Sequence, residues 1–389
     1  MSDPSTIRQD DGMLARAIVP RPAEVNYGFT GDETDLRSCT ASIRRGSKSF
    51  HIASLILPRK TRRAAHALYA FCRHSDDLID DADRGPDALR RLRQRLDLIY
   101  EGRPLDHACD RAFGRLVHRH AIPKGIPSAL LDGFGMDIAE REYRTIADVK
   151  TYAAGVASTV GLMMSLVMGV SDSWTLARAA DLGIAMQLTN IARDVGEDAR
   201  NCRLYLPRDW LDEAGIDAEA FLARPRFSAE LAELVKRLLA EADRHYALGH
   251  AGIANLPADC RHAIRTAALT YQDIGSSIAE NGYDTVSSRA RTTLLRKLAL
   301  MLKARMPVQE AAAAAAWTMT EPADPSVRFL VEAAARAVAP ATQQSEPDPQ
   351  LTGSGIERFA TIIMELQTRA IENHRYRRIE RLERAAKLA

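Results

Sequence analysis

Apolar residues recur at intervals of three and four along most of this chain, from about residue 38 to about residue 305. This spacing places them on one face of an α-helix, and the alternating runs of β-branched residues that mark strands are missing. Breaks that contain proline or glycine fall near residues 57, 101, 121, 206 and 255. Helices end at such breaks, so the sequence predicts a single large all-α domain of many helices.

Composition divides the chain into three zones. Residues 1–37 are polar, lack a lasting periodicity and are predicted to be a flexible N-terminal segment. Residues 38–305 form the helical domain, and residues 306–389 are predicted to be a helical C-terminal extension. The extension contains, in order, helices near 309–318 and 326–338, a linker near 339–355 and a helix over 356–388.

The last helix of the extension is basic and amphipathic. Ile356, Phe359 and Ile363 share one face, and several arginines lie around them. Such a helix suits peripheral association with a membrane that carries anionic lipid. The same spacing fits a helix that packs on the domain or on another copy of the chain. The sequence leaves both alternatives open and does not determine the oligomeric state.

Overall composition excludes several classes of protein for this chain. The formal net charge is +2, and no basic stretch alternates with aromatic residues, so we expect no nucleic-acid partner. The 5 cysteines are scattered without a C-x-x-C motif, which is typical of reduced thiols. No stretch has the pattern of a signal peptide or the length of a membrane span. We therefore expect a cytoplasmic protein, with the inner face of a membrane as an alternative location.

A first acidic cluster lies in RHSDDLIDDAD at residues 73–83. On a helix, Asp76 and Asp80 share one face, as do Asp77 and Asp81, and like charges at this spacing repel each other. The cluster contains no lysine, and the apolar run HALYAF leads into it. Either the helix is a solvated surface helix, or a divalent cation offsets the repulsion.

A second polar stripe lies in QLTNIARDVGEDARNCRLY at residues 187–205, and it consists of Gln187, Asn190, Asp194 and Asp198. An apolar face adjoins it, so this helix either carries a solvated stripe or presents ligands beside a core. Two helices with such stripes can face each other across a helical bundle. Mg²⁺ is commonly held by one or two carboxylates, waters and phosphate oxygens. The two stripes together therefore predict a diphosphate bound through Mg²⁺, with Mn²⁺ as an alternative metal.

Three further features fit a prenyl diphosphate. Near a helix start, the segment RRGSKSF at 44–50 contains Ser47, Lys48 and Ser49. These residues either bind phosphate or belong to an ordinary polar loop. The small residues of YAAGVASTVG at 152–161 leave room for a hydrocarbon or for tight helix packing. The aromatic residues near these motifs either stabilise a carbocation or belong to the core; they are Phe50, Tyr69, Tyr152 and Tyr205. No nucleotide-binding glycine loop occurs, so NADPH is not expected.

Five segments in order resemble the head-to-head prenyl synthase family, which includes squalene and phytoene synthases. They are GSKSF at 46–50, YAFCRHSDDLIDDAD at 69–83, YAAGVASTVG at 152–161, QLTNIARDVGEDARNCRLYLP at 187–207 and ENGYDTVSSRA at 280–290. The resemblance covers about 38–300, roughly two-thirds of the chain. It implies an isoprenoid-synthase fold around a central cavity.

The resemblance also implies roles for individual residues. The implied Mg²⁺ ligands are Asp76, Asp80, Asn190, Asp194 and Asp198. The implied phosphate contacts are Ser47, Ser49, Arg73, Gln187, Arg203 and Arg289. The family has an arginine pair in the last motif, whereas this chain has Ser288-Arg289. With Tyr205, the carboxylates and Arg73 form the expected catalytic group.

The implied reaction joins two molecules of geranylgeranyl diphosphate through prephytoene diphosphate to give phytoene, with release of diphosphate, in carotenoid biosynthesis. Synthases that use C15 substrates to make dehydrosqualene or hydroxysqualene are the main alternative. Linear chain-elongating prenyl synthases share D-D-x-x-D, but their second motif is normally another D-D-x-x-D, whereas this chain has N-x-x-x-D-x-x-x-D. A non-catalytic assembly factor of the same fold would lack metal ligands that are present here.

Overall fold

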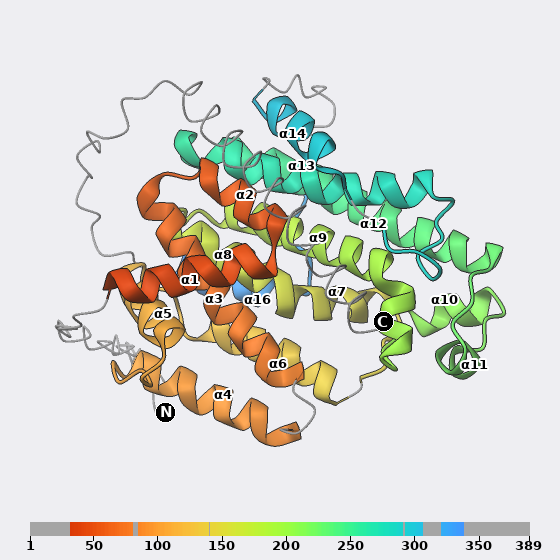
Figure 1. The fold of residues 1–389 in the computed structure, drawn as a ribbon, viewed down its shortest axis with the longest axis horizontal. Helices are drawn as coiled ribbons and strands as arrows, with labels where there is room; N and C mark the ends of the chain where they lie inside the picture. Colours follow the sequence, from red (N-terminus) through yellow and green to blue (C-terminus); the bar gives the residue numbers. More distant parts are fainter. Residues whose placement is uncertain (1–31, 81–84, 140, 291, 306–319, 338–389) are drawn as a thin grey trace, which may run out of the picture.

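Helices joined by short loops make up most of the described chain, and no β-strand occurs within this part (Figure 1). The computed structural model describes residues 32–80, 85–139, 141–290, 292–305 and 320–337. The helices are α1 (Asp32–Gly46), α2 (Lys48–Ile56), α3 (Arg59–Asp80), α4 (Gly85–Tyr100), α5 (Ala108–Arg119), α6 (Gly125–Ile138), α7 (Ile146–Ala153), the π-helix η1 (Ala154–Ser158), α8 (Thr159–Val167), α9 (Ser173–Arg200), α10 (Arg208–Glu213), α11 (Ala218–Ala223), α12 (Ala229–Ile253), α13 (Ala258–Glu280), α14 (Leu294–Lys303) and α16 (Arg328–Ala335). The all-α prediction is confirmed.

The helix boundaries follow local signals in the sequence. Every predicted break coincides with a junction between helices, as between α2 and α3 at Leu57-Pro58. Where α9 begins, the side chain of Asp172 accepts a hydrogen bond of 2.8 Å from the backbone N–H of Thr175. Such N-caps satisfy backbone donors that the first turn leaves unpaired. The helix predicted near 326–338 is found as α16.

One boundary differs from the sequence-based expectation. Residues 32–37, which we assigned to the flexible N-terminal segment, form the first turns of α1. Asp35 in this stretch is 1% exposed, and its carboxylate accepts hydrogen bonds from Arg111 at 2.6 Å and Arg115 at 2.7 Å. These partners come from α5, about 80 residues away, and a local pattern cannot reveal them. Tertiary ion pairs therefore extend the helix toward the N-terminus.

Helix α9 runs through the middle of the bundle, with α13 and α14 toward one edge and α4 and α5 toward the opposite edge (Figure 1). It packs along α12 and also contacts α13, α8 and η1. Glycines permit this close approach, because a Cβ atom on Gly183 would lie 2.6 Å from the Cα of Ser158. Gly252 of α12 similarly leaves no room for a side chain beside Arg178 of α9. A large side chain at either glycine would push the helices apart.

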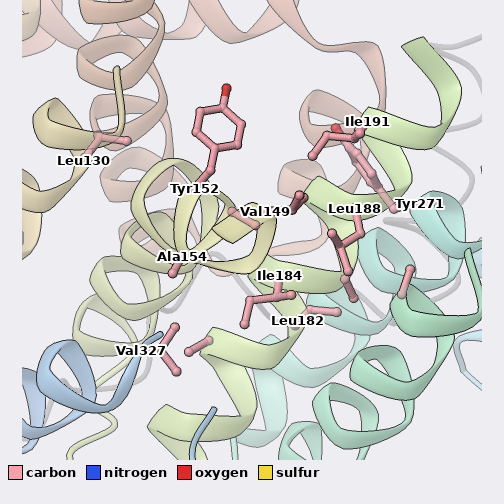
Figure 2. Close-up of a cluster of buried hydrophobic side chains, with 14 of the residues drawn as sticks. Leu130, Val149, Tyr152, Ala154, Leu182, Ile184, Leu188, Ile191, Tyr271 and Val327 are labelled. Carbon is pink, nitrogen blue, oxygen red and sulfur yellow. The ribbon is translucent and has the colours of Figure 1, made fainter. Parts of the chain in front are cut away.

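One continuous hydrophobic core surrounds α9. Figure 2 shows Val149 and Tyr152 of α7 in the same cluster as Ile184 and Leu188 of α9. Val327, which precedes α16, also belongs to this cluster. From the predicted C-terminal extension, the described residues 320–337 thus pack into the core of the main helical domain.

Buried charges hold the segment that precedes α16. Arg178 is fully buried, and its guanidinium donates hydrogen bonds to the carbonyl oxygens of Glu321 at 3.1 Å and Pro322 at 3.2 Å. Its Nε lies 3.0 Å from a carboxylate oxygen of Asp181, which compensates the buried charge. Lys150 on α7 forms an ion pair with Asp324 at 2.9 Å. A buried cation with this many partners fixes one position for the segment.

His245 of α12 completes this network. Its Nδ1 lies 2.8 Å from an oxygen of Asp181, and its Nε2 lies 3.6 Å from Glu241. Burial by itself disfavours the charged imidazolium, but the contacts with Asp181 and Glu241 outweigh it and raise the pKa of His245. His245 lowers the pKa of Glu241 in turn, to about 2. The network therefore favours a protonated His245.

We predict that His245→Gln destabilises the protein more at about pH 6 than at about pH 9. The folded-state pKa of His245 is raised, so its stabilising effect is complete below the unfolded value of about 6.5 and is lost as the pH rises through the folded value. The loss in unfolding free energy should be about 2 kcal/mol at the lower pH, as for a hydrogen bond to a charged group. Thermal unfolding of both proteins at both pH values measures it. An equal loss at the two pH values would contradict a charged His245.

Four sequence-based predictions lie wholly or mostly outside the described residues: the flexible N-terminal segment up to residue 31, the helix near 309–318, the linker near 339–355 and the helix over 356–388. Among the helices that the structure describes, none is both long and apolar enough to cross a bilayer.

Candidate active site

A cavity of about 870 Å³ opens between α2 and α3 on one side and α9, α12 and α13 on the other. Its lining follows one face of α9 from Thr175 to Asp198, which corresponds to a rise of about 35 Å. Near Thr175 the lining is apolar and includes Met164, Met168 and Leu256. Toward Asp198 it becomes polar. The cavity thus combines a polar end with a long apolar part.

The polar end gathers most of the residues that the sequence singled out. Of these, the cavity lining contains Ser47, Phe50, Tyr69, Arg73, Asp76, Tyr152, Gln187, Asn190, Asp194, Asp198, Arg203, Tyr205 and Arg289. Helix α3 ends at Asp80, and the side chains of Asp80, Lys48 and Ser49 lie outside the described part of the structure. Segments as far apart in the sequence as Ser47 and Arg289 therefore meet at one cavity.

Helix α3 forms one polar wall. Tyr69, Arg73 and Asp76 follow one another at intervals of four and three residues, so all three point into the cavity. Arg73 lies 3.1 Å from an oxygen of Asp76 and 2.5 Å from an oxygen of Asp77. The sequence-based argument considered only lysine as a counter-charge, but this arginine one turn earlier offsets part of the repulsion. Asp77 is 53% exposed and does not line the cavity.

Helix α9 forms the opposite wall, where Asp194 and Asp198 have different surroundings. Burial by itself would raise the pKa of Asp194, but hydrogen bonds from Arg193 at 2.8 Å and Arg289 at 2.7 Å outweigh it and lower this pKa. Burial, followed by the charge of Asp194, raises the pKa of Asp198 to about 7. One carboxylate is thus held by two arginines, and the other is partly buried with little compensation.

The donor set at this wall fits a hard divalent cation. The side-chain N–H of Asn190 donates to Gln187 at 3.3 Å, whereas its Oδ1 is buried without a hydrogen-bond partner. A buried oxygen without a donor is unfavourable unless another group binds it. Carboxylate and amide oxygens are the ligands that Mg²⁺ prefers, and Asp194 and Asp198 line the same cavity. The residues present therefore fit a Mg²⁺ site.

The loop before α2 borders the polar end. Ser47 is the N-cap of α2, and its hydroxyl accepts a hydrogen bond of 3.2 Å from the backbone N–H of Phe50. A Cβ atom on Gly46 would collide with the hydroxyl of Tyr69, so glycine lets α3 approach this loop closely. The start of α2 thereby presents backbone N–H groups beside the cavity, which favours an anion.

Sequence reasoning singled out Tyr152 and Tyr205 but missed Asp137 of α6, which binds both hydroxyls. The hydroxyl of Tyr205 donates to Asp137 at 2.7 Å, and the hydroxyl of Tyr152 donates to it at 3.1 Å. The two rings stack with their centroids 4.9 Å apart. All three residues line the cavity, so the carboxylate fixes two aromatic rings at its wall. An aspartate at position 137, within the largely apolar stretch LLDGFGMDI, was the available signal.

Other cavity residues were also missed. Tyr271 of α13 stacks on Phe50 with a centroid distance of 5.0 Å, and Arg193 and Lys297 reach the cavity as well. In the sequence, Tyr271 belongs to an ordinary amphipathic helix and the two cations resemble surface residues. Only the packing of α13 and α14 beside α9 reveals their place.

The run of small residues at 152–161 serves both purposes that the sequence left open. Gly155 packs on α6, where a Cβ atom would lie 3.1 Å from the Cα of Gly133. Val156, Ala157 and Gly161 line the cavity. The π-helix η1 lies within this run.

A family model described as squalene/phytoene synthase matches residues 43–296. The chain belongs to the squalene/phytoene synthase family. It is 46% identical over 314 residues to a phytoene synthase of Cereibacter sphaeroides, covering 78% of this chain and 88% of the relative. It is 45% identical over 311 residues to a phytoene synthase of Rhodobacter capsulatus, covering 78% and 91%.

Solved structures of family members agree with this fold. A dehydrosqualene synthase with bound ligand is 29% identical, with a TM-score of 0.65 that covers 71% of this chain and 97% of that one. A squalene synthase from Alicyclobacillus acidocaldarius is 23% identical, with a TM-score of 0.60 over 65% and 95%, and supports the fold alone. The expected isoprenoid-synthase fold is confirmed.

We predict opposite effects on stability for two substitutions at the polar end of the cavity when Mg²⁺ is absent. Asp198→Asn should raise the unfolding free energy by about 1 kcal/mol near neutral pH, because it removes a partly buried charge beside Asp194. Asp194→Asn should lower it by about 2 kcal/mol, because Arg193 and Arg289 lose their partner. Urea unfolding in EDTA measures both values. Changes of the same sign would refute this account of the charges.

Proposed function

We propose that this protein condenses two molecules of geranylgeranyl diphosphate head to head, through prephytoene diphosphate, to phytoene, as a prenyltransferase of carotenoid biosynthesis. The observation that carries this proposal is one cavity that joins two acidic helices to a long apolar part. The 45% and 46% identity to proteins named phytoene synthase favours phytoene over a C15 product. The dehydrosqualene synthase structure is less similar, at 29% identity.

The polar end would bind the diphosphate groups. Asp76 and Asp80 on α3 would hold Mg²⁺, or Mn²⁺, together with Asn190, Asp194 and Asp198 on α9. A bound metal supplies charge neutralisation for the diphosphate as it leaves. Arg73 and Arg289 already lie beside the carboxylates, so cations for the phosphate oxygens are at hand. Ser47, Gln187 and Arg203 line the same end of the cavity.

Loss of diphosphate from the first substrate leaves an allylic cation, which the double bond of the second substrate attacks. The resulting tertiary cation loses a proton as the cyclopropane ring closes. The apolar lining excludes water, which would otherwise trap the cation. The stacked rings of Tyr152 and Tyr205, fixed by Asp137, present aromatic surface to the cavity, and aromatic faces stabilise cations. The cyclopropyl intermediate, prephytoene diphosphate, then loses its own diphosphate, rearranges and gives up a proton. No reductant enters this sequence.

We predict that the purified protein with Mg²⁺ converts geranylgeranyl diphosphate to phytoene at the same rate with and without NADPH. The C15 substrate farnesyl diphosphate should react more slowly, because its chain fills less of the apolar part of the cavity. Chromatography and mass spectrometry of the hydrocarbons identify the products. Strict dependence on NADPH, or preferential formation of a C30 product, would contradict the assignment of phytoene and indicate a squalene-type reaction.

We also predict that Asp76→Asn lowers turnover by at least about a thousandfold, because a metal ligand at the leaving diphosphate would be lost. Asp77→Asn is the matched control, since Asp77 is the adjacent residue but is exposed and does not line the cavity. It should retain turnover within about threefold. Release of diphosphate is the measured quantity, and circular dichroism verifies folding. Equal losses in the two variants would refute the assignment of the cavity wall.

A further inference from the structure

Helix α14 carries an apolar stripe that nothing in the described structure covers. Leu295 is 80% exposed and Leu302 is 48% exposed, and Ala299 between them is also exposed. These residues are four and three positions apart, so they share one helix face. Leu295 is the most exposed large hydrophobic side chain among the described residues. Exposed leucines at helical spacing mark an interaction surface rather than a core.

The other faces of α14 are firmly docked, which fixes the outward direction of this stripe. Met301 is 1% exposed and packs with Ile52 of α2. Arg296 forms ion pairs with Asp273 at 2.7 Å and Glu280 at 2.8 Å, both on α13. Lys297 lines the cavity. Figure 1 shows α14 at the periphery of the bundle, on the outer side of α13.

The surroundings of the stripe are basic. From residue 285 to residue 309 the chain contains six arginines and lysines and no acidic residue. Arg289 and Arg296 are engaged with carboxylates of α9 and α13. Lys303 and Arg305, at the end of α14, are exposed beside Leu302. Leucines next to cations on one short helix match the boundary between lipid headgroups and acyl chains.

We propose that the Leu295–Leu302 face of α14 docks on the surface of a bilayer that contains anionic lipid. A second copy of the same face would bring Lys303 and Arg305 against identical charges, whereas anionic headgroups attract them. A membrane at this face would lie one helix diameter, about 10 Å, from a wall of the cavity. A hydrocarbon product could then pass a short distance into lipid. The docking does not depend on which hydrocarbon the site makes.

The experiment measures binding of the full chain to vesicles without substrate. Vesicles of phosphatidylcholine with about 30% phosphatidylglycerol should bind the protein, and pure phosphatidylcholine should bind it at least about tenfold more weakly. The double variant Leu295→Asp/Leu302→Asp should lower the partition coefficient at least about tenfold, because it loses both apolar contacts and adds negative charge. Leu105→Asp/Phe227→Asp is the matched control, since both residues are exposed, at 43% and 40%, in loops away from α14. The control should bind as the unmodified protein does.

A second pair of substitutions tests whether vesicle binding requires the cations at the end of α14. Lys303→Gln/Arg305→Gln should weaken binding to the anionic vesicles about 25-fold, from about fivefold for each cation near the surface. Arg224→Gln/Arg226→Gln removes two exposed cations elsewhere and should have no such effect.

Three outcomes would overturn the proposal. Vesicle binding that survives Leu295→Asp/Leu302→Asp would assign membrane contact to another part, such as the helix predicted over 356–388. Absence of binding by the unmodified protein, with a dimer that the same variant dissociates, would assign the face to a second copy. Absence of both would leave the face without a role. Membrane docking and the reaction are tested separately, because the formation of phytoene is measured in detergent without vesicles. A failure of the proposed reaction therefore leaves the vesicle-binding result unaffected.

Discussion

The close packing of α9 against its neighbours is the constraint on which the site depends. Gly183 allows contact with η1, and Gly252 of α12 allows contact with α9 beside Arg178. One side of α9 can therefore be buried in the core while another faces the cavity. A helix held less tightly could not keep Asn190 and Asp194 at a fixed position opposite α3.

Arginines form ion pairs with the carboxylates that the reaction would need. Arg73 contacts Asp76, and Arg289 contacts Asp194. These ion pairs reduce the repulsion within each acidic wall, so the polar end is stable before any ligand binds. They also keep cations next to the carboxylates, where a metal and a diphosphate would bring charges of both signs. Asp198 has no comparable ion pair among the described residues, so burial and the charge of Asp194 raise its pKa.

Residues beyond the segment matched by the family contribute to the same core. The matched segment ends at residue 296, yet Val327, Leu330 and Val331 are buried in the main hydrophobic cluster. Arg178 and Lys150 bind the segment that leads to α16 through charges. One buried network thereby couples the stability of α9, which lines the cavity, to the stability of the segment around α16. His245 makes this coupling depend on pH.

The sequence by itself determined the helical class, the positions of the helix breaks and the two acidic stripes. These features depend on residues three to four apart, and local spacing reports such interactions directly. It could not reveal Asp137 beneath Tyr152 and Tyr205, Tyr271 stacked on Phe50, or Arg289 on Asp194, because those partners come from segments far apart in the sequence. It also placed residues 32–37 outside the helical domain, since the burial of Asp35 depends on α5. Tertiary structure decided these points, because burial and long-range charge pairing exist only once the helices have packed.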